Sequence, residues 1–516
     1  LVNPLYSPVY MSKFYLTTPL YYVNDKPHLG TAYTTILADV ISRYHKSMNE
    51  DVFFLTGTDE HGQKVQEAAE KRQIEPKKHV DEYVNEFKNL WKKLHINNDD
   101  FIRTTEKRHT DKVVKILQQL FNNGEIYKDK YEGMYSVSEE RFITPKEAEE
   151  GEFREVKKIV EENYFFKMSK YQSKLINHIK NNPDFIQPEG RKNEILGFLK
   201  KPLNDLCISR PKSRLKWGIE LPFDNNYVTY VWFDALINYI SAIGWDNNEE
   251  FFRQTWPANY HLIGKDILTT HAVYWPTMLM SIGLPLPKTI FAHGWWLSGE
   301  SKMSKSLGNI INPLQLVDKY GVDPLRYFLM KEMVLGKDST FTTDLFIERY
   351  NSDLANDFGN LVNRVTILIH KHFSSKIPEP GNYDEVDLEL IGFAKTTPQL
   401  VIKDIENLKI PDGIEKILIL MRKINKYLEV KSPWKSIKLD SSQKSVAATT
   451  MYISADLLRI CTQLLNPVMP NKTINILNML GSKLIPLNDY STNLIKVGQK
   501  LGDGKSPFPR IIMRPC

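Results

Sequence analysis

Cysteine is scarce in this sequence: three residues among 516, Cys207, Cys461 and Cys516, and they lie far apart. Their spacing argues against both a disulfide framework and a thiolate zinc site. Long apolar runs are also missing. No stretch reaches the ~18 consecutive apolar residues of a membrane span, and no apolar signal-peptide core is present near the N-terminus. We therefore expect a soluble protein that is kept reduced.

A strong charge imbalance is also lacking, since 68 Lys and Arg stand against 62 Asp and Glu, a net charge of +6. This balance excludes a protein that coats nucleic acid but permits a local patch that contacts phosphates. With 42% hydrophobic and 25% charged residues, the chain is typical of globular proteins. At roughly 150 residues per domain, its length predicts about three domains.

The first hundred residues alternate between strand and helix patterns. The segment 13–17 is β-prone, apolar residues recur at helical spacing beyond Gly30, and 52–55 is a short buried strand. This alternation predicts a doubly wound parallel sheet of the Rossmann type, in which ligands bind at the carboxyl ends of the strands.

The alternation falters between about Glu132 and Asn226, where charge is dense, and is expected to resume with strands at 227–232, 261–263 and 289–292. After about Phe341, helical periodicity dominates. The expected organisation is an α/β catalytic domain with an inserted connective subdomain, followed by an α-helical bundle. The ranges are 1–12 for an N-terminal extension, 13–131 and 227–340 for the two catalytic halves, 132–226 for the insert and 341–516 for the bundle.

Pro27-His28-Leu29-Gly30 lies after a predicted strand and opens a predicted helix. Backbone N–H groups and the positive end of the helix dipole favour a phosphate at such a place. His28 can donate to a phosphate oxygen, and Gly30 lets a flat base pack on the backbone. Alone, a His-Leu-Gly tripeptide more often marks only a capped helix start.

The segment 299–309 is rich in Gly and Ser and includes Lys302-Met303-Ser304-Lys305-Ser306. Two ammonium groups on such a loop can stabilise the negative charge that builds on a leaving pyrophosphate. The alternative is a solvated basic loop, which the specificity of the string disfavours.

These two elements resemble the His-Ile-Gly-His and Lys-Met-Ser-Lys-Ser signatures of class I aminoacyl-tRNA synthetases. The segments 17–24, 57–62, 230–235, 264–267 and 292–295 are similar to those of the methionyl-tRNA synthetase family within that class, and the resemblance runs from about Phe14 to Trp434. It implies that ATP and L-methionine react to methionyl-adenylate and that methionine then passes to tRNA(Met).

The resemblance also assigns residues to the reaction. Asp59 is implied to hold the methionine ammonium, and Tyr22 with the backbone of Leu20 to face the sulfur; an unbranched thioether gains from contact with aromatic edges. The rest of the methionine pocket is Trp232, Ala235, Tyr239, Ile267, His271 and Trp275. The catalytic set is His28, Lys302 and Lys305, and the ATP set is His28, Gly30, Thr31, Gly264, Asp266, His293 and Lys305. Without the resemblance, Trp232, Trp275 and His271 are better read as core residues.

This sequence departs from the family pattern at two places. Thr31 stands where the second histidine of the first signature is usual, and it cannot carry charge. The insert reads Tyr135-Ser136-Val137-Ser138-Glu139-Glu140-Arg141 where many relatives have zinc-ligand cysteines. We therefore expect no metal site and no zinc, with Mg²⁺ bound mainly by the oxygens of ATP.

Asn360 and Arg364 lie four residues apart in a predicted helix, and Trp434 follows another helix in a basic stretch. All three match the anticodon readers of the family. From Met421 to Lys438 there are six Lys or Arg against one Glu, and a tryptophan offers a face for an unpaired base. The alternative for the charges is a solvated helix face.

Two other functions stay open at this stage: a small-molecule ligase of the same nucleotidyl-transferase superfamily, which needs no basic helical domain, and a non-catalytic RNA-binding paralogue. The first 24 residues contain no acid and one lysine, Lys13, which hints at a trimmed organellar transit peptide. With the zinc-free insert and the lack of an appended C-terminal domain, this favours the mitochondrial matrix over the bacterial cytoplasm. We expect a monomer without membrane contact.

Overall fold

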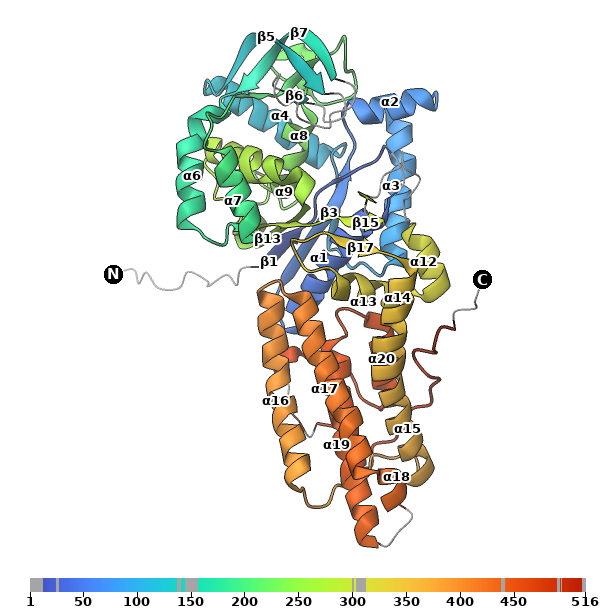
Figure 1. Ribbon diagram of the computed structural model, residues 1–516. Coiled ribbons are helices and arrows are strands. Elements are labelled where there is room, and N and C mark those ends of the chain that lie inside the picture. Colours follow the sequence, from blue (N-terminus) through green and yellow to red (C-terminus); the bar gives the residue numbers. More distant parts are fainter. Residues whose placement is uncertain are drawn as a thin grey trace, which may run out of the picture. The chain divides into compact units, whose positions relative to one another are not determined.

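The computed structural model describes residues 13–24, 27–136, 141–143, 156–298, 301–302, 312–437, 441–489, 492 and 494–512. They form two compact units (Figure 1). Unit 1 holds the described residues of Leu1–Pro27, Asp51–Lys92 and Ile96–His293, and unit 2 those of His28–Glu50, Lys93–His95 and Gly294–Cys516. Helix α1 (Leu29–Ser47) falls in unit 2, where its Tyr44 hydroxyl donates to the Leu464 carbonyl at 2.7 Å.

A parallel sheet of seven strands forms the centre of unit 1. Its order is β2-β3-β1-β13-β14-β8, with β4 also paired to β3. The strands are β1 (Phe14–Thr17), β2 (Tyr21–Tyr22), β3 (Val52–Asp59), β4 (Asp100–Arg103), β8 (Ile186–Gln187), β13 (Tyr260–Gly264) and β14 (Thr289–His293). β1, β13 and β14 are mostly buried apolar runs, as expected for strands covered on both faces. The sheet confirms the predicted Rossmann-like fold class.

Two antiparallel sheets also belong to unit 1. The first has the order β6-β5-β7-β9, and the second β10-β12-β11. Their strands are β5 (Ile126–Ser136), β6 (Arg141–Ile143), β7 (Val156–Phe166), β9 (Leu206–Cys207), β10 (Ser209–Pro211), β11 (Glu220–Leu221) and β12 (Asp224–Thr229). Strand β7 and the last residues of its partner β5 lie within the expected insert, although β5 begins at Ile126, before the expected start at Glu132. Strand β8 also lies within the expected insert, but it pairs with β14 in the parallel sheet.

The predicted strand at 227–232 is wrong in two respects. Its first residues belong to β12, which pairs antiparallel with β10 and β11 rather than joining the parallel sheet. Its last residues begin helix α8 (Val231–Leu236), so Trp232 is helical. The run Tyr-Val-Trp-Phe is β-prone, but Phe233, Asp234 and Ala235 are all buried, and tertiary contacts override the local preference.

Helices cover the sheets of unit 1. They are α2 (Gln63–Lys71), α3 (Pro76–Lys93), α4 (Lys107–Asn122), α6 (Gln172–Asn181), α7 (Glu189–Phe198), α8, α9 (Asn238–Ser241), α10 (Glu249–Thr255) and α11 (Trp275–Ser281), with the short 3-10 helices η1 (Met168–Tyr171) and η2 (Lys265–Ile267) and the π-helix η3 (Thr270–Tyr274). A hydrophobic core joins α4, α8, α9 and α11 to the strands.

Unit 2 is largely helical. It has one small sheet of order β16-β15-β17, with β15 (Trp296–Ser298), β16 (Ser301–Lys302) and β17 (Ser339–Phe341). Its helices are α1, α12 (Pro313–Tyr320), α13 (Val322–Glu332), α14 (Thr343–Arg349), η5 (Tyr350–Gly359), α15 (Asn360–His372), α16 (Glu385–Glu406), α17 (Ile410–Lys431), α18 (Pro433–Ser436), α19 (Ser441–Leu464), α20 (Pro470–Met479) and η6 (Leu487–Asp489). The predicted helical bundle is confirmed.

Two sequence features set the ends of the long helices, which run side by side in Figure 1. Asp384 and Asp387 form a capping box at the start of α16, which satisfies two backbone N–H groups. Ser432 has a φ of 43°, and Pro433 cannot continue α17, so the chain turns and begins α18 with Trp434 in its first turn. Among the described residues, no helix is long and apolar enough to cross a bilayer.

Candidate active site

Asp59 and Tyr22 lie together at the carboxyl end of the parallel sheet in unit 1. Tyr22 of β2 is the register partner of Asp59, the last residue of β3. Asp59 is 2% exposed, so its carboxylate is largely removed from water. A Cβ at Gly57 would lie 2.0 Å from the Ile102 carbonyl oxygen and 2.9 Å from Leu20, so only glycine fits there. The predicted residues Leu20, Tyr22 and Asp59 therefore share one end of the sheet.

An aromatic wall continues from Tyr22. The Tyr22 and Trp232 rings meet edge to face with centroids 6.0 Å apart, and Trp232 meets His271 in the same way at 6.1 Å. Ala235 follows Trp232 by three residues on α8, so the two share a face of that helix. Edge-to-face rings of this kind present the polarisable surface that suits a thioether.

His271 is neutral and its tautomer is fixed by its neighbours. Nδ1 lies 3.0 Å from the Ile267 carbonyl oxygen, which can only accept, so Nδ1 carries the proton. Nε2 then accepts from the Tyr239 hydroxyl at 2.8 Å. Burial lowers the pKa of His271 to about 4, so it brings no positive charge at neutral pH. Ile267, His271 and Tyr239 are thus one hydrogen-bonded unit.

Trp275 and His261 lie next to Tyr239. The Trp275 indole N–H donates to His261 Nε2 at 3.2 Å, so the His261 proton is on Nδ1, 2.7 Å from the Thr17 hydroxyl. Burial holds the pKa of His261 well below its usual range, so this ring is neutral too. The Tyr239 ring stacks on His261 with centroids 4.2 Å apart. His261 and His271 therefore add no positive charge to this part of the unit.

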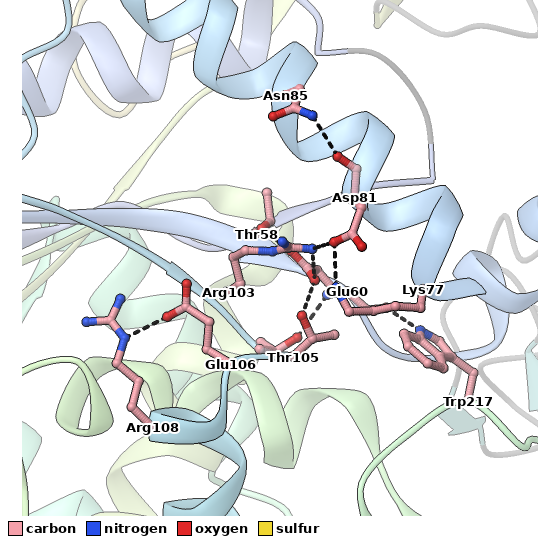
Figure 2. Close-up of polar contacts among 11 residues, drawn as sticks. Thr58, Glu60, Lys77, Asp81, Asn85, Arg103, Thr105, Glu106, Arg108 and Trp217 are labelled. Carbon is pink, nitrogen blue, oxygen red and sulfur yellow. Dashed lines mark hydrogen bonds and ion pairs between the residues drawn. The ribbon is translucent and has the colours of Figure 1, made fainter. Parts of the chain in front are cut away.

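A buried ion pair fixes the chain directly after Asp59 (Figure 2). Glu60 is 0% exposed, and its two carboxylate oxygens accept from Arg103 Nε at 2.6 Å and Nη2 at 2.9 Å. The hydroxyls of Thr58 and Thr105 also donate to Glu60. Because Arg103 ends β4, this bidentate pair fastens the ends of β3 and β4 to each other.

The three predicted ATP residues of unit 1 meet at the ends of β13 and β14. Gly264 and His293 are register partners on these strands. A Cβ at Gly264 would lie 2.5 Å from Asp266 Oδ1 and 3.8 Å from His293 Cε1, so a side chain here would displace Asp266. The close approach explains the glycine, and the end of a parallel strand is where nucleotides bind in such sheets.

His28 caps helix α1 in unit 2. Its Nδ1 accepts from the Gly30 backbone N–H at 3.1 Å, which leaves the ring proton on Nε2 in a neutral histidine. A Cβ at Gly30 would lie 3.0 Å from His28 Cε1, so glycine makes room for the capping ring. Thr31 is 8% exposed in the first turn. The cap uses Nδ1 of His28, and the phosphate role of this residue stays a prediction.

Lys302 ends strand β16, where its backbone is paired with Leu297 of β15. Lys305 and the rest of 303–311 lie outside the described residues. The catalytic role of both lysines therefore remains a prediction.

Arg364 and Trp434 of the helical bundle are neighbours. The Arg364 guanidinium lies over the Trp434 ring, 5.5 Å from its centroid, and Nη1 donates to Asn425 Oδ1 at 3.2 Å. Arg364 Nη1 is also 3.7 Å from Glu429 Oε1. Asn360 is exposed, one turn earlier on α15. Two residues far apart in sequence are thus held together as a cation–π pair.

Sequence reasoning missed the polar partners behind these residues, among them Glu60, Arg103 and His261. The position of Glu60 could have indicated such a partner, since an acid inside a run of buried residues needs a cation or several hydrogen-bond donors. Nothing in the sequence indicated that the cation is Arg103, because β4 is short and 43 residues further on.

Comparisons with known proteins agree with this geometry. The family model described as "tRNA synthetases class I (M)" matches residues 14–152 and 149–366. The methionine–tRNA ligase of Clostridium acetobutylicum is 45% identical over 506 residues, which cover 97% of this chain and 78% of that protein. The Bacillus subtilis enzyme of the same name is 42% identical over 520 residues, covering 96% and 78%.

A solved structure of similar fold is Mycobacterium tuberculosis methionyl-tRNA synthetase in complex with methionyl-adenylate. It superposes with a TM-score of 0.93 and 37% identity, covering 97% of this chain and 100% of that one. Similarity of this extent in sequence and in fold means that the chain belongs to the methionyl-tRNA synthetases of class I.

Proposed function

We propose that this chain activates L-methionine with ATP, forming methionyl-adenylate and pyrophosphate, and then transfers methionine to tRNA(Met). The observation that carries this proposal is the set of neutral aromatic side chains next to the buried Asp59 at the carboxyl end of the parallel sheet. The ring edges suit the thioether, and the one carboxylate of the set suits the α-ammonium. The methionine residues are those expected from the sequence: Leu20, Tyr22, Asp59, Trp232, Ala235, Tyr239, Ile267, His271 and Trp275.

The first step needs little acid–base chemistry by side chains. The methionine carboxylate attacks the α-phosphorus of ATP, and the bond to the pyrophosphate breaks. Asp59 fixes the ammonium, so the carboxylate of the same substrate is held in position for attack. In unit 1, Gly264, Asp266 and His293 bind the nucleotide at the strand ends; in unit 2, Gly30 and Thr31 keep the ATP role expected from the sequence. Mg²⁺ enters with ATP and neutralises phosphate charge; it is held mainly by substrate oxygens.

Charge on the leaving pyrophosphate is stabilised by His28, Lys302 and Lys305. His28 Nε2–H is a donor at the start of α1, where backbone N–H groups and the helix dipole also favour an anion. The two ammonium groups interact more strongly with the separating pyrophosphate than with intact ATP, which is why they accelerate the reaction.

Replacing Lys302 or Lys305 with alanine is expected to lower kcat of adenylate formation about 10²–10³-fold, the usual cost of removing one such charge-stabilising group. The KM for methionine should change little. Single-turnover adenylate formation measures both quantities. Lys319, an exposed lysine of α12, provides the control, and Lys319→Ala should match the parent enzyme. A raised methionine KM at unchanged kcat would contradict the assignment.

The anticodon of tRNA(Met) is read by Asn360, Arg364 and Trp434. The support is the contact between Arg364 and the half-buried Trp434, which presents a ring and a guanidinium at one place. An unpaired base can stack on such a platform while the guanidinium donates to its edge.

Trp434→Ala should therefore lower kcat/KM for tRNA by about one to two orders of magnitude, since a stacked base contributes ~1–3 kcal/mol. Methionine-dependent pyrophosphate exchange without tRNA should stay at the parent rate. Phe393 offers a matched control, because its ring lies under Lys423 Nζ at 4.6 Å in the same bundle and it has no proposed anticodon role. The anticodon role would be contradicted if Trp434→Ala and Phe393→Ala lowered kcat/KM for tRNA equally. It would also be contradicted if Trp434→Ala lowered the rate of pyrophosphate exchange.

The proposal also covers the compartment, the oligomeric state, the insert and the metal content of the protein. The relatives named above are bacterial, which does not support the mitochondrial matrix and is consistent with the cytoplasmic alternative. We propose a monomer, and an inserted subdomain over the range 132–226, which takes in β7 and the last residues of β5. In the described part of the chain, no group of three His, Cys, Asp or Glu is arranged to hold a metal. The zinc-free insert stays a prediction.

Aminoacylation tests the whole function. The purified chain with ATP, Mg²⁺ and L-methionine should attach methionine to tRNA(Met) and leave an elongator tRNA of another amino acid uncharged. A small-molecule ligase would form adenylate without charging tRNA, and a non-catalytic paralogue would bind tRNA without consuming ATP. Neither alternative is favoured by the relatives, which are methionine–tRNA ligases over most of this chain.

A further inference from the structure

A buried carboxylate with two histidine partners lies behind the aromatic wall of unit 1. Asp234 is 0% exposed; its Oδ2 lies 2.6 Å from His61 Nδ1 and its Oδ1 lies 2.7 Å from His109 Nε2. Burial alone would raise the pKa of Asp234, but the charge of His61 and the hydrogen bonds from both histidines outweigh it and hold that pKa below its usual value. The ionised carboxylate therefore accepts from both rings.

These three residues come from three separate elements. Asp234 lies on α8, between Trp232 and Ala235 of the proposed methionine pocket. His61 follows β3 two residues after Asp59, and its ring is 5.4 Å from that of Trp217, whose indole N–H donates to the Glu60 carbonyl. His109 lies in the first turn of α4, and its Nδ1 is 2.8 Å from the Ser241 hydroxyl of α9.

Asp234 does not form part of the pocket wall. On a helix, residues two apart point about 200° away from each other, so Trp232 and Asp234 leave α8 on different sides. Trp232 meets Tyr22 and His271, whereas Asp234 meets His61 and His109. Asp234 can therefore act on methionine only through the position of α8 relative to the end of β3.

We propose that Asp234 is a positioning residue for methionine binding: through His61 and His109 it holds α8, with Trp232 and Ala235, at the distance from Asp59 that fits the substrate. The inference rests on the methionine pocket proposed above. Side chains that contact a substrate must be held by a rigid second layer, because displacements of about 1 Å already cost binding and rate.

The first test is Asp234→Asn, which keeps the shape but turns one oxygen into an N–H₂ group that cannot accept from a histidine N–H. The KM for methionine in pyrophosphate exchange should rise about tenfold or more, and the KM for ATP should stay within about twofold. Calorimetric titration with methionine alone should show the same weakening. The matched control is Asp353→Asn: Asp353 is a buried carboxylate of η5 that accepts from the Tyr327 hydroxyl at 2.8 Å.

A second pair of variants decides the question if Asp234→Asn does not fold. The side-chain amide of His109→Gln can still donate to Asp234, whereas His109→Leu removes the donor. Leucine should raise the methionine KM about tenfold, and glutamine should restore it to within about threefold of the parent. A purely structural role would instead lower the melting temperature and the active fraction while both KM values stay unchanged.

Trp232→Ala separates this inference from the pocket itself. If Trp232→Ala leaves the methionine KM unchanged, the proposed pocket is wrong and the inference falls with it. If Trp232→Ala raises that KM while Asp234→Asn and His109→Leu do not, the pocket stands and the positioning role of Asp234 is overturned. A rise in the methionine KM for all three, with Asp353→Asn at the parent value, supports the inference.

Discussion

Replacing Asp59 with alanine should raise the KM for methionine by about two to three orders of magnitude, because a desolvated ammonium that loses its charged partner costs about 3–5 kcal/mol. Asp59 is 2% exposed and is the one acid among the proposed methionine residues. His271 and His261 do not substitute for it, because an imidazole carries no negative charge and their Nε2 atoms already accept from Tyr239 and Trp275. The KM for ATP should change far less.

Pyrophosphate exchange at varied methionine and at varied ATP measures both constants in the same preparation. Asp100→Ala is a suitable control, since Asp100 lies at the amino end of β4, away from the strand ends that carry Asp59. It should leave both constants at the parent values. A methionine KM for Asp59→Ala equal to that of the parent would refute the ammonium role.

The Arg103→Ala variant should lose about 3–5 kcal/mol of unfolding free energy, because it leaves the Glu60 carboxylate buried without a cation. Glu60 is fully buried, and the remaining donors from side chains are the hydroxyls of Thr58 and Thr105. Arg103 also donates to Asp81, so a second acid loses one of its two cationic partners and keeps the other, Lys77 (Figure 2). Urea unfolding at neutral pH, followed by circular dichroism, measures the loss.

Arg108→Ala is the matched control, because Arg108 also pairs with two acids but in a more exposed place. Its side chain is 39% exposed, against 18% for Arg103, and its partners are Asp100 and Glu106. Exposed pairs contribute about 1 kcal/mol or less, so this variant should unfold close to the parent. Equal losses for the two arginine variants would show that burial of the Glu60 pair carries no special stability.

Much of the fold could be predicted from local sequence. The strands β1, β3, β13 and β14 are short apolar runs, and buried parallel strands have that pattern. The apolar spacing of its residues predicted helix α1, and Pro433 predicted the break in the helix before α18. These features depend on residues within a few positions of each other, which is the range over which sequence patterns are informative.

Features that depend on distant partners could not be predicted. Trp232 was expected in a strand, and it lies in a helix of six residues whose Asp234 is bound by His61 and His109, 173 and 125 residues away. Strand β8 has two residues, too few for a periodic pattern, and its place in the sheet depends on its pairing with β14.

In the candidate site, too, the residues could be predicted from the sequence and their distant contacts could not. Its residues were expected through resemblance to a family, whose motifs mark positions along the chain. The contacts that hold them were not, because hydrogen bonds such as Tyr239 to His271 join residues that no local pattern relates. The platform of Arg364 and Trp434 combines both: each residue was named in advance, and the structure adds the contact between them.

Methionine-dependent exchange of pyrophosphate into ATP, run side by side with the other amino acids, tests the central claim most directly. The proposed methionine pocket pairs one buried carboxylate with neutral aromatic rings, and an unbranched thioether fits such rings better than a branched or charged side chain does. We predict rapid exchange with L-methionine and exchange at least about 10²-fold slower, judged by kcat/KM, with leucine, isoleucine and valine. Equal exchange with leucine, or none with methionine, would contradict the account.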